Sequence, residues 1–162
     1  MRYLLLLAVL LVAPSNVLAG QPAWPDLAPL LGQPKDSPAV VAMVRQQALS
    51  ETTKGPSGSF SSPDGSWSML YESSRIKTIV LRVSPPGEGS SSPERQTFAP
   101  PLPGKLTRQD GRAQVVQKLG QPSRPDGDQW LHQGLVIWVF FDQSERQINE
   151  LYLWQQEQAE KP

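Results

Sequence analysis

The sequence predicts an α+β protein of two tandem repeats, each of short helices followed by an antiparallel β-hairpin or meander, with the helices packed on one face of the sheet. The tetrapeptide Leu-Gly-Gln-Pro at residues 31–34 recurs at residues 119–122, and each copy closes a short helical pattern. Gly can take the left-handed conformation at a helix end, and Pro cannot continue the helix. The two closing strands, at residues 76–81 and 148–153, also match, with apolar side chains at the first, fourth and sixth places.

The first half is expected to contain one main helix and two strands. Ser37 is a good N-cap and Pro38 suits the first helical position, so the pattern predicts a helix over residues 37–49. Apolar side chains recur along it at helical spacing. The expected elements that follow are a polar stretch rich in Gly, Pro and Ser (52–63), a strand (66–71), a turn (72–75) and a strand (76–83).

The second half is expected to repeat this order. Asp110 is predicted to be the N-cap of a helix that ends at Leu119. The strand at residues 135–141 is apolar on both faces, so we expect it to be central, with helices on one face and the other repeat or a partner on the other. The remaining expected elements are a strand (129–132), turns (133–134 and 142–146) and a last strand (147–154).

Residues 1–19 are expected to be a cleavable secretory signal. Arg2 precedes an apolar run at residues 4–13, which has the length of a signal-peptide core and falls short of the roughly 20 residues that span a bilayer. Small residues precede the expected cleavage point near Ala19, so the mature chain is predicted to be periplasmic. Beyond the signal, the expected organisation is a first repeat (20–84), a Pro/Gly/Ser-rich linker (85–103), a second repeat (104–154) and a polar tail (155–162).

The composition excludes several classes of function. The chain contains no cysteine, which rules out disulfides, thiol catalysis, cysteine–zinc sites and a lipidated cysteine. Its 15 basic and 15 acidic residues balance, and the basic ones are scattered, so we expect no nucleic-acid partner. A second apolar run of membrane length does not occur, so no membrane insertion is expected after signal removal.

No catalytic constellation is recognisable, so the sequence predicts a protein that is not an enzyme and holds no cofactor or metal. His132, the only histidine, stands beside a predicted turn, and no Gly-x-Ser-x-Gly motif accompanies it. Asp126 and Asp128 resemble a fragment of a calcium loop whose remaining ligands are missing. They and Asp142 fall at turns, where Asp bonds the local backbone. A hydrolase that uses these three carboxylates is the third and weakest hypothesis.

The aromatic residues give the strongest functional indication. They fall in the predicted strands, and Trp and Tyr are favoured anchors at protein interfaces. Since both faces of a small sheet carry them, they cannot all lie in the core. Trp138 and Tyr152 are on adjacent strands and form the preferred pair. The full predicted partner-binding set is Trp138, Tyr152, Trp130, Phe140 and Trp154.

The segment Leu-Pro-Gly-Lys-Leu at residues 102–106, together with Asp110, the second Leu-Gly-Gln-Pro and Trp130, carries a family resemblance. It resembles small exported bacterial proteins with two tandem helix-plus-sheet repeats, over most of residues 27–154. The architecture is also similar to the β-lactamase inhibitor proteins and to small outer-membrane assembly lipoproteins. This resemblance implies binding of another protein on an exposed sheet. The disulfides of the former and the acylated cysteine of the latter are absent, so no specific target carries over.

These observations predict a periplasmic protein-binding protein that neutralises or regulates its partner. The first hypothesis is an immunity protein against a secreted antibacterial effector, of the kind that type VI secretion delivers. Its partner would be an effector toxin or an envelope enzyme. The alternative is a non-catalytic accessory protein of envelope assembly.

Overall fold

The computed structural model describes residues 20–53, 55–85, 96–99, 101–124 and 127–156, so the predicted signal at 1–19 lies outside the described residues. The helical elements within them are α1 (Trp24–Leu27), η1 (Ala28–Leu30), α2 (Pro38–Gln46), η2 (Pro103–Lys105) and α3 (Arg112–Leu119). The strands are β1 (Ser50–Glu51), β2 (Gly58–Ser61), β3 (Trp67–Glu72), β4 (Arg75–Arg82), β5 (Gln129–His132), β6 (Leu135–Phe141) and β7 (Ile148–Gln155). This confirms the predicted α+β class.

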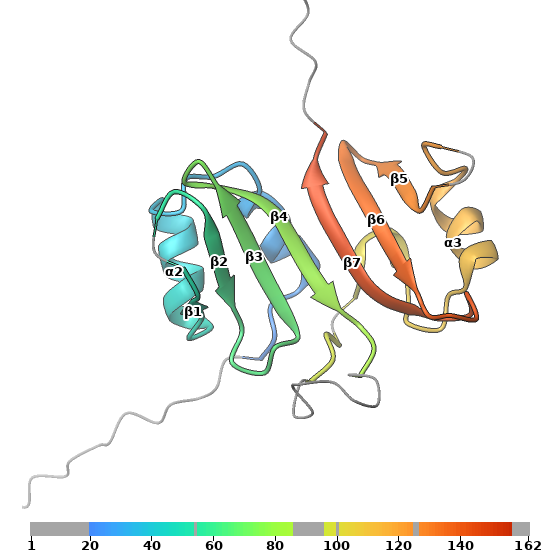
Figure 1. Ribbon diagram of the computed structural model, residues 1–162, viewed down its shortest axis with the longest axis horizontal. Coiled ribbons are helices and arrows are strands. Elements are labelled where there is room, and N and C mark those ends of the chain that lie inside the picture. Colours follow the sequence, from blue (N-terminus) through green and yellow to red (C-terminus); the bar gives the residue numbers. More distant parts are fainter. Residues whose placement is uncertain (1–19, 54, 86–95, 100, 125–126, 157–162) are drawn as a thin grey trace, which may run out of the picture.

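The strands form one antiparallel sheet in the order β1-β2-β3-β4-β7-β6-β5 (Figure 1). Each half of the chain contributes a meander, β2-β3-β4 or β5-β6-β7, and the two meanders join where β4 pairs with β7. The sheet is therefore continuous across both halves. β6, which we expected to be central, is an inner strand next to the edge strand β5.

The predicted strands agree with the structure to within one residue at their ends, but two strands, β1 and β2, were missed. The stretch at 52–63 that we predicted to be polar loop contains β2, which pairs with β3 along its whole length. The composition of β2 is Gly-Ser-Phe-Ser, so Phe60 alone carries an apolar signal. Phe60 is buried and its ring lies 5.3 Å from that of Tyr71.

The helix ends differ from the prediction for local reasons. Ser37 is the N-cap of α2, as predicted, because its hydroxyl accepts a hydrogen bond from the Val40 N–H (3.4 Å). The prediction that Asp110 caps α3 is wrong: the N-cap is Gly111. The Asp110 carboxylate instead accepts from the Thr107 N–H (2.7 Å) and from the Lys118 ammonium (2.6 Å), so its oxygens are engaged away from the helix start.

The first Leu-Gly-Gln-Pro segment follows η1 and runs beside β4. The Gly32 N–H donates to the Ile76 carbonyl (2.7 Å), and the Ile76 N–H donates to the Gln33 carbonyl (2.9 Å). Both repeated glycines have positive φ, 77° at Gly32 and 87° at Gly120, as the helix-end prediction requires. Both copies come at the end of a helical element, η1 or α3, but the first is followed by a helix (α2) and the second by a strand (β5).

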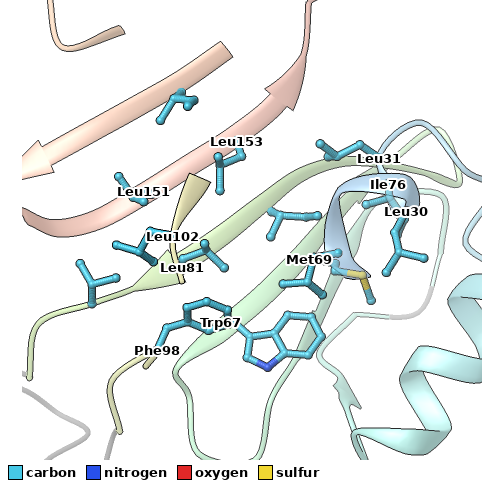
Figure 2. Close-up of a cluster of buried hydrophobic side chains, with 14 of the residues drawn as sticks. Leu30, Leu31, Trp67, Met69, Ile76, Leu81, Phe98, Leu102, Leu151 and Leu153 are labelled. Carbon is cyan, nitrogen blue, oxygen red and sulfur yellow. The ribbon is translucent and has the colours of Figure 1, made fainter. Parts of the chain in front are cut away.

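One buried cluster joins residues of the helices and of the sheet. At the junction of the two halves, Ile79 lies opposite Leu153 and Leu81 lies opposite Leu151, and all four side chains are fully buried. Figure 2 shows Leu151 and Leu153 beside Leu81 and Leu102. Within the described residues, no helix has the length and apolar character needed to cross a membrane.

Candidate functional site

The face of the sheet that lies away from this core carries a second set of apolar side chains. Residues directly opposite in neighbouring strands project to the same face. Gln129 of β5 lies opposite Trp138 of β6, Trp138 lies opposite Tyr152 of β7, and Tyr152 lies opposite Val80 of β4. The alternate positions on these strands, such as Ile137, belong to the core cluster.

Four aromatic side chains on this face contact one another, and we call them the aromatic face: Trp138, Phe140, Tyr152 and Trp154. The Trp138 ring centroid lies 4.6 Å from that of Phe140, 6.3 Å from that of Tyr152 and 6.5 Å from that of Trp154. Phe140 and Tyr152 are 5.0 Å apart. These spacings are those of favourable aromatic pairs. Four of the five predicted binding residues are thus brought together.

Trp130, the fifth predicted residue, does not lie on this face. It is opposite Ile137, its side chain is 0% exposed, and it makes an edge-to-face contact with Phe141 (6.5 Å). Its indole N–H donates to the Gly120 carbonyl (3.0 Å), so its polar atom is also satisfied inside the protein. A direct role for Trp130 in partner binding is therefore wrong, and Trp130 is a core residue.

The aromatic face extends to the edge of the sheet through a residue that the sequence reasoning missed. Leu131 of β5 lies opposite Val136 and is a diagonal neighbour of Trp138 on the same face. Leu131 and Trp138, 48% and 37% exposed, are the exposed large hydrophobic residues of the described chain. Because neighbouring residues of a strand point to opposite faces, Trp130 and Leu131 in the sequence Gln-Trp-Leu-His (129–132) cannot both be buried. This alternation could have identified Leu131 from the sequence.

Beside the aromatic face lies a groove of about 1030 Å³. It occupies the end of the sheet where β4 and β7 diverge, because their pairing covers only Ile79 to Arg82 of β4. Tyr152, Trp154 and Trp138 line it on one side, and Leu70 and Thr78 on the other. Side-chain amides that were not predicted also line it, namely those of Gln133, Gln155 and Gln156.

The surroundings of the aromatic face are close to neutral. Arg82 and Glu150, opposite each other on β4 and β7, form an ion pair (3.5 Å) near Tyr152. Burial, and then the negative charge of Glu150, raise the pKa of Tyr152. Of the residues that line the groove, Glu72 and Lys77 carry charge, and their signs cancel. The arrangement favours an uncharged, partly apolar ligand.

The carboxylates that we considered for catalysis have local structural partners. Asp142 accepts from the Ser144 hydroxyl (2.8 Å) and from the Arg146 N–H (2.9 Å), and these hydrogen bonds lower its pKa. Asp128 pairs with Arg112 (2.5 Å). Asp126 lies outside the described residues. Across the described ranges, no three His, Cys, Asp or Glu side chains gather closely enough to hold a metal ion.

His132 lies on the other face of the sheet from the aromatic face. It is the last residue of β5 and is half-buried, opposite Leu135. A side chain at Gly104 would stand 3.9 Å from its Nε2 atom. His132 therefore lies on the opposite face from Trp138 and is not one of the residues that line the groove.

No protein-family model matches this chain. No curated protein and no solved structure matches it either. The family resemblance stated above therefore stays a prediction.

Proposed function

We propose that this chain is a periplasmic protein-binding protein that neutralises or regulates its partner, and specifically an immunity protein against a secreted antibacterial effector. The observation that carries the proposal is the aromatic face, which exposes Trp138 and Leu131 on the side of the sheet away from the core. Contiguous exposed apolar surface rimmed by polar groups is typical of interaction sites. Trp and Tyr are also enriched among the residues that dominate binding energy.

The export signal supports the compartment, and it rests on the sequence alone. Arg2, the apolar run at 4–13 and the small residues before Gly20 have the order of a secretory signal. A chain without cysteine has no thiol that the oxidising conditions outside the cytoplasm could convert to a disulfide. An envelope location would place the aromatic face where secreted effectors arrive.

We also propose the finer architecture, two tandem repeats with their helices on one face of the sheet. In support, Val40 of α2 and Val115 of α3 belong to the same buried cluster as Ile79 and Leu151. Three of the four pairs between β4 and β7 are also related by exchange of the two strands, since Ile79–Leu153 exchanges with Leu81–Leu151 and Val80–Tyr152 maps onto itself. Helices on one face would leave the aromatic face free for a partner.

The proposal is tested by capture from the producing cell. The full chain with a C-terminal tag is purified from periplasmic and secreted fractions alongside Trp138→Ala and Arg45→Ala, where Arg45 is an exposed residue of α2. We expect one stoichiometric partner with the native chain and with Arg45→Ala, and at least tenfold less with Trp138→Ala.

A second arm tests the physiological role. Cells that lack this protein should become sensitive to a co-encoded effector, or to sister cells that deliver it, and the native chain should restore resistance. Unchanged resistance would contradict the immunity role. Recovery of envelope-assembly components with the native chain, together with envelope defects in a pure culture of the deletion strain, would favour the accessory role instead.

A further inference from the structure

Two tryptophans that line the groove carry indole N–H groups without a hydrogen-bond acceptor among the described residues. These are Trp138 and Trp154, which also contact each other edge to face (6.5 Å, 81° between ring planes). The fully buried Trp130, by contrast, donates to Gly120. An indole N–H is a donor only. A ligand that covers both rings must therefore supply acceptors, or else leave both donors unsatisfied.

The rest of the lining combines uncharged polar groups with apolar surface. The three amides, Gln133, Gln155 and Gln156, supply donors and acceptors alike, and Glu72 is the single carboxylate among the lining residues. Leu70, Val136 and the aromatic rings supply apolar surface. Since Glu72 and Lys77 cancel in charge, the lining complements a segment that is uncharged, apolar and rich in acceptors.

We propose that the groove binds an uncharged, proline-rich extended segment of the partner protein, an inference that rests on the proposed protein-binding function. Proline has a carbonyl acceptor but no backbone N–H, so a proline-rich segment presents acceptors without donors. In the polyproline II conformation its carbonyls have no internal partners and its conformation is largely fixed before binding. Grooves lined by aromatic residues recognise such segments elsewhere by the same physics.

The size of the groove fits a short segment of this kind. Its lining residues come from β3, β4, β7 and β6, which follow one another across the sheet. Three strand spacings of about 4.8 Å would give about 14 Å, and the groove is at least this wide because β4 and β7 are not paired there. At about 3.1 Å per residue, polyproline II crosses it with at least about five residues.

The test uses the purified protein and synthetic eight-residue peptides with blocked ends. One peptide consists of proline with two interspersed leucines, and its control replaces every proline with alanine, which restores the N–H groups. Binding is followed by calorimetry and by the NMR signals of the indole N–H groups. We expect the proline peptide to bind at least about tenfold more tightly than the control. The indole signals of Trp138 and Trp154 should move, and that of Trp130 should not.

Trp138→Phe tests the hydrogen-bond component, because it keeps a ring and removes the N–H. We expect affinity for the proline peptide to fall about threefold to tenfold, with thermal unfolding as the check that the variant is folded. The inference would be overturned if the two peptides bound equally or if neither bound. It would also be overturned if the indole NMR signals shifted only on addition of an uncharged oligosaccharide. These results are separable from the proposed function. A captured partner that depends on Trp138 but is not displaced by excess proline peptide contradicts the groove assignment alone.

Discussion

Val80 of β4 lies directly opposite Tyr152 of β7, within the pairing that joins the two halves of the chain. The two positions are 72 residues apart, which is also the offset between the matching segments 76–81 and 148–153. A shift of 72 residues that exchanges the two strands turns the pair Ile79–Leu153 into the pair Leu81–Leu151. Val80 is 1% exposed although it lies on the face of Tyr152 rather than in the main core cluster. Tyr152 therefore has a structural role beside Val80, whereas Trp138, further out, is free to contact a partner.

Substitution of the two tryptophans on neighbouring strands should separate binding from stability. Trp130→Ala removes a fully buried side chain and should lower the free energy of unfolding by about 3–5 kcal/mol. Trp138→Ala removes a side chain that is 37% exposed and should cost about 1 kcal/mol while abolishing partner capture. Denaturant unfolding gives the first quantity and tagged capture the second. A larger stability loss for Trp138→Ala than for Trp130→Ala would reverse the assignment of the two faces.

Gln21 should contribute more to stability than its position at the start of the described chain suggests. Its amide nitrogen donates to Asp64 (3.0 Å), Ser66 (3.0 Å) and the Thr97 carbonyl (3.1 Å), and its oxygen accepts from the Ala99 N–H (2.9 Å). Gln21→Ala should lower the free energy of unfolding by about 1–3 kcal/mol, because it leaves several partners unpaired.

A matched control for Gln21 is Gln47→Ala, in which one exposed hydrogen bond to the Gly20 carbonyl (3.4 Å) is lost. The control should cost less than about 0.5 kcal/mol. Both variants are compared by denaturant unfolding at neutral pH. Equal losses would mean that the Gln21 hydrogen bonds do not hold the segment at residues 97–99 to the turn at residues 62–66.

Asp64 should make the fold sensitive to acid. Burial acts to raise the pKa of its carboxyl, but hydrogen bonds from Ser62, Ser66 and Gln21 outweigh burial and hold the pKa below the ordinary 3.8. A carboxyl whose pKa is lowered on folding stabilises the protein above its unfolded pKa, and that stability is lost as pH falls through the folded value. The free energy of unfolding should therefore decline below about pH 4, and Asp64→Asn should decline less. An identical acid profile for the two chains would contradict this.

Tyr71 should make the fold sensitive to alkali. A hydrogen bond to Glu51 (2.7 Å) and then burial raise the pKa of Tyr71 to about 12. A raised pKa contributes stability that is complete below the unfolded value of 10.0 and is lost as pH rises toward 12. Ultraviolet titration of tyrosinate should show this shift, and Glu51→Gln should bring the titration closer to 10.0. Ionisation of Tyr71 at its ordinary pKa in the folded chain would contradict the prediction.

Local pattern was sufficient to predict most of the sheet and most of the aromatic face. The strands at 129–132 and 135–141 have the predicted ends because residues of high strand propensity flank the turn at Gln133 and Gly134, whose φ angles are 53° and 78°. Alternation also placed Trp138 and Tyr152 together. Alternation alone does not indicate which face of a strand is buried, so Trp130 was assigned to the wrong face. The hydrogen bond from its indole N–H to the Gly120 carbonyl, ten residues away in the chain, is not visible in the pattern.

The features that were missed depend on contacts between distant segments. β2 forms against β3 although its own side chains carry little apolar signal. The Asp110 carboxylate forms an ion pair with Lys118 and does not cap the helix, and the residue preferences at N-caps do not include such a partner. The groove exists because β4 pairs with Gly32 and Gln33, rather than with β7, near Ile76. None of these pairings is encoded by local propensity alone.

Photo-crosslinking in living cells would identify which face of the protein contacts the partner. A photoreactive amino acid is placed at position 138 on the aromatic face or at position 45 on α2, in the full chain expressed by the producing cell. We expect a single covalent adduct of fixed mass from position 138 and none from position 45. An adduct from position 45 alone, or no adduct from position 138 in cells that respond to an effector, would contradict the claim that the aromatic face binds the partner.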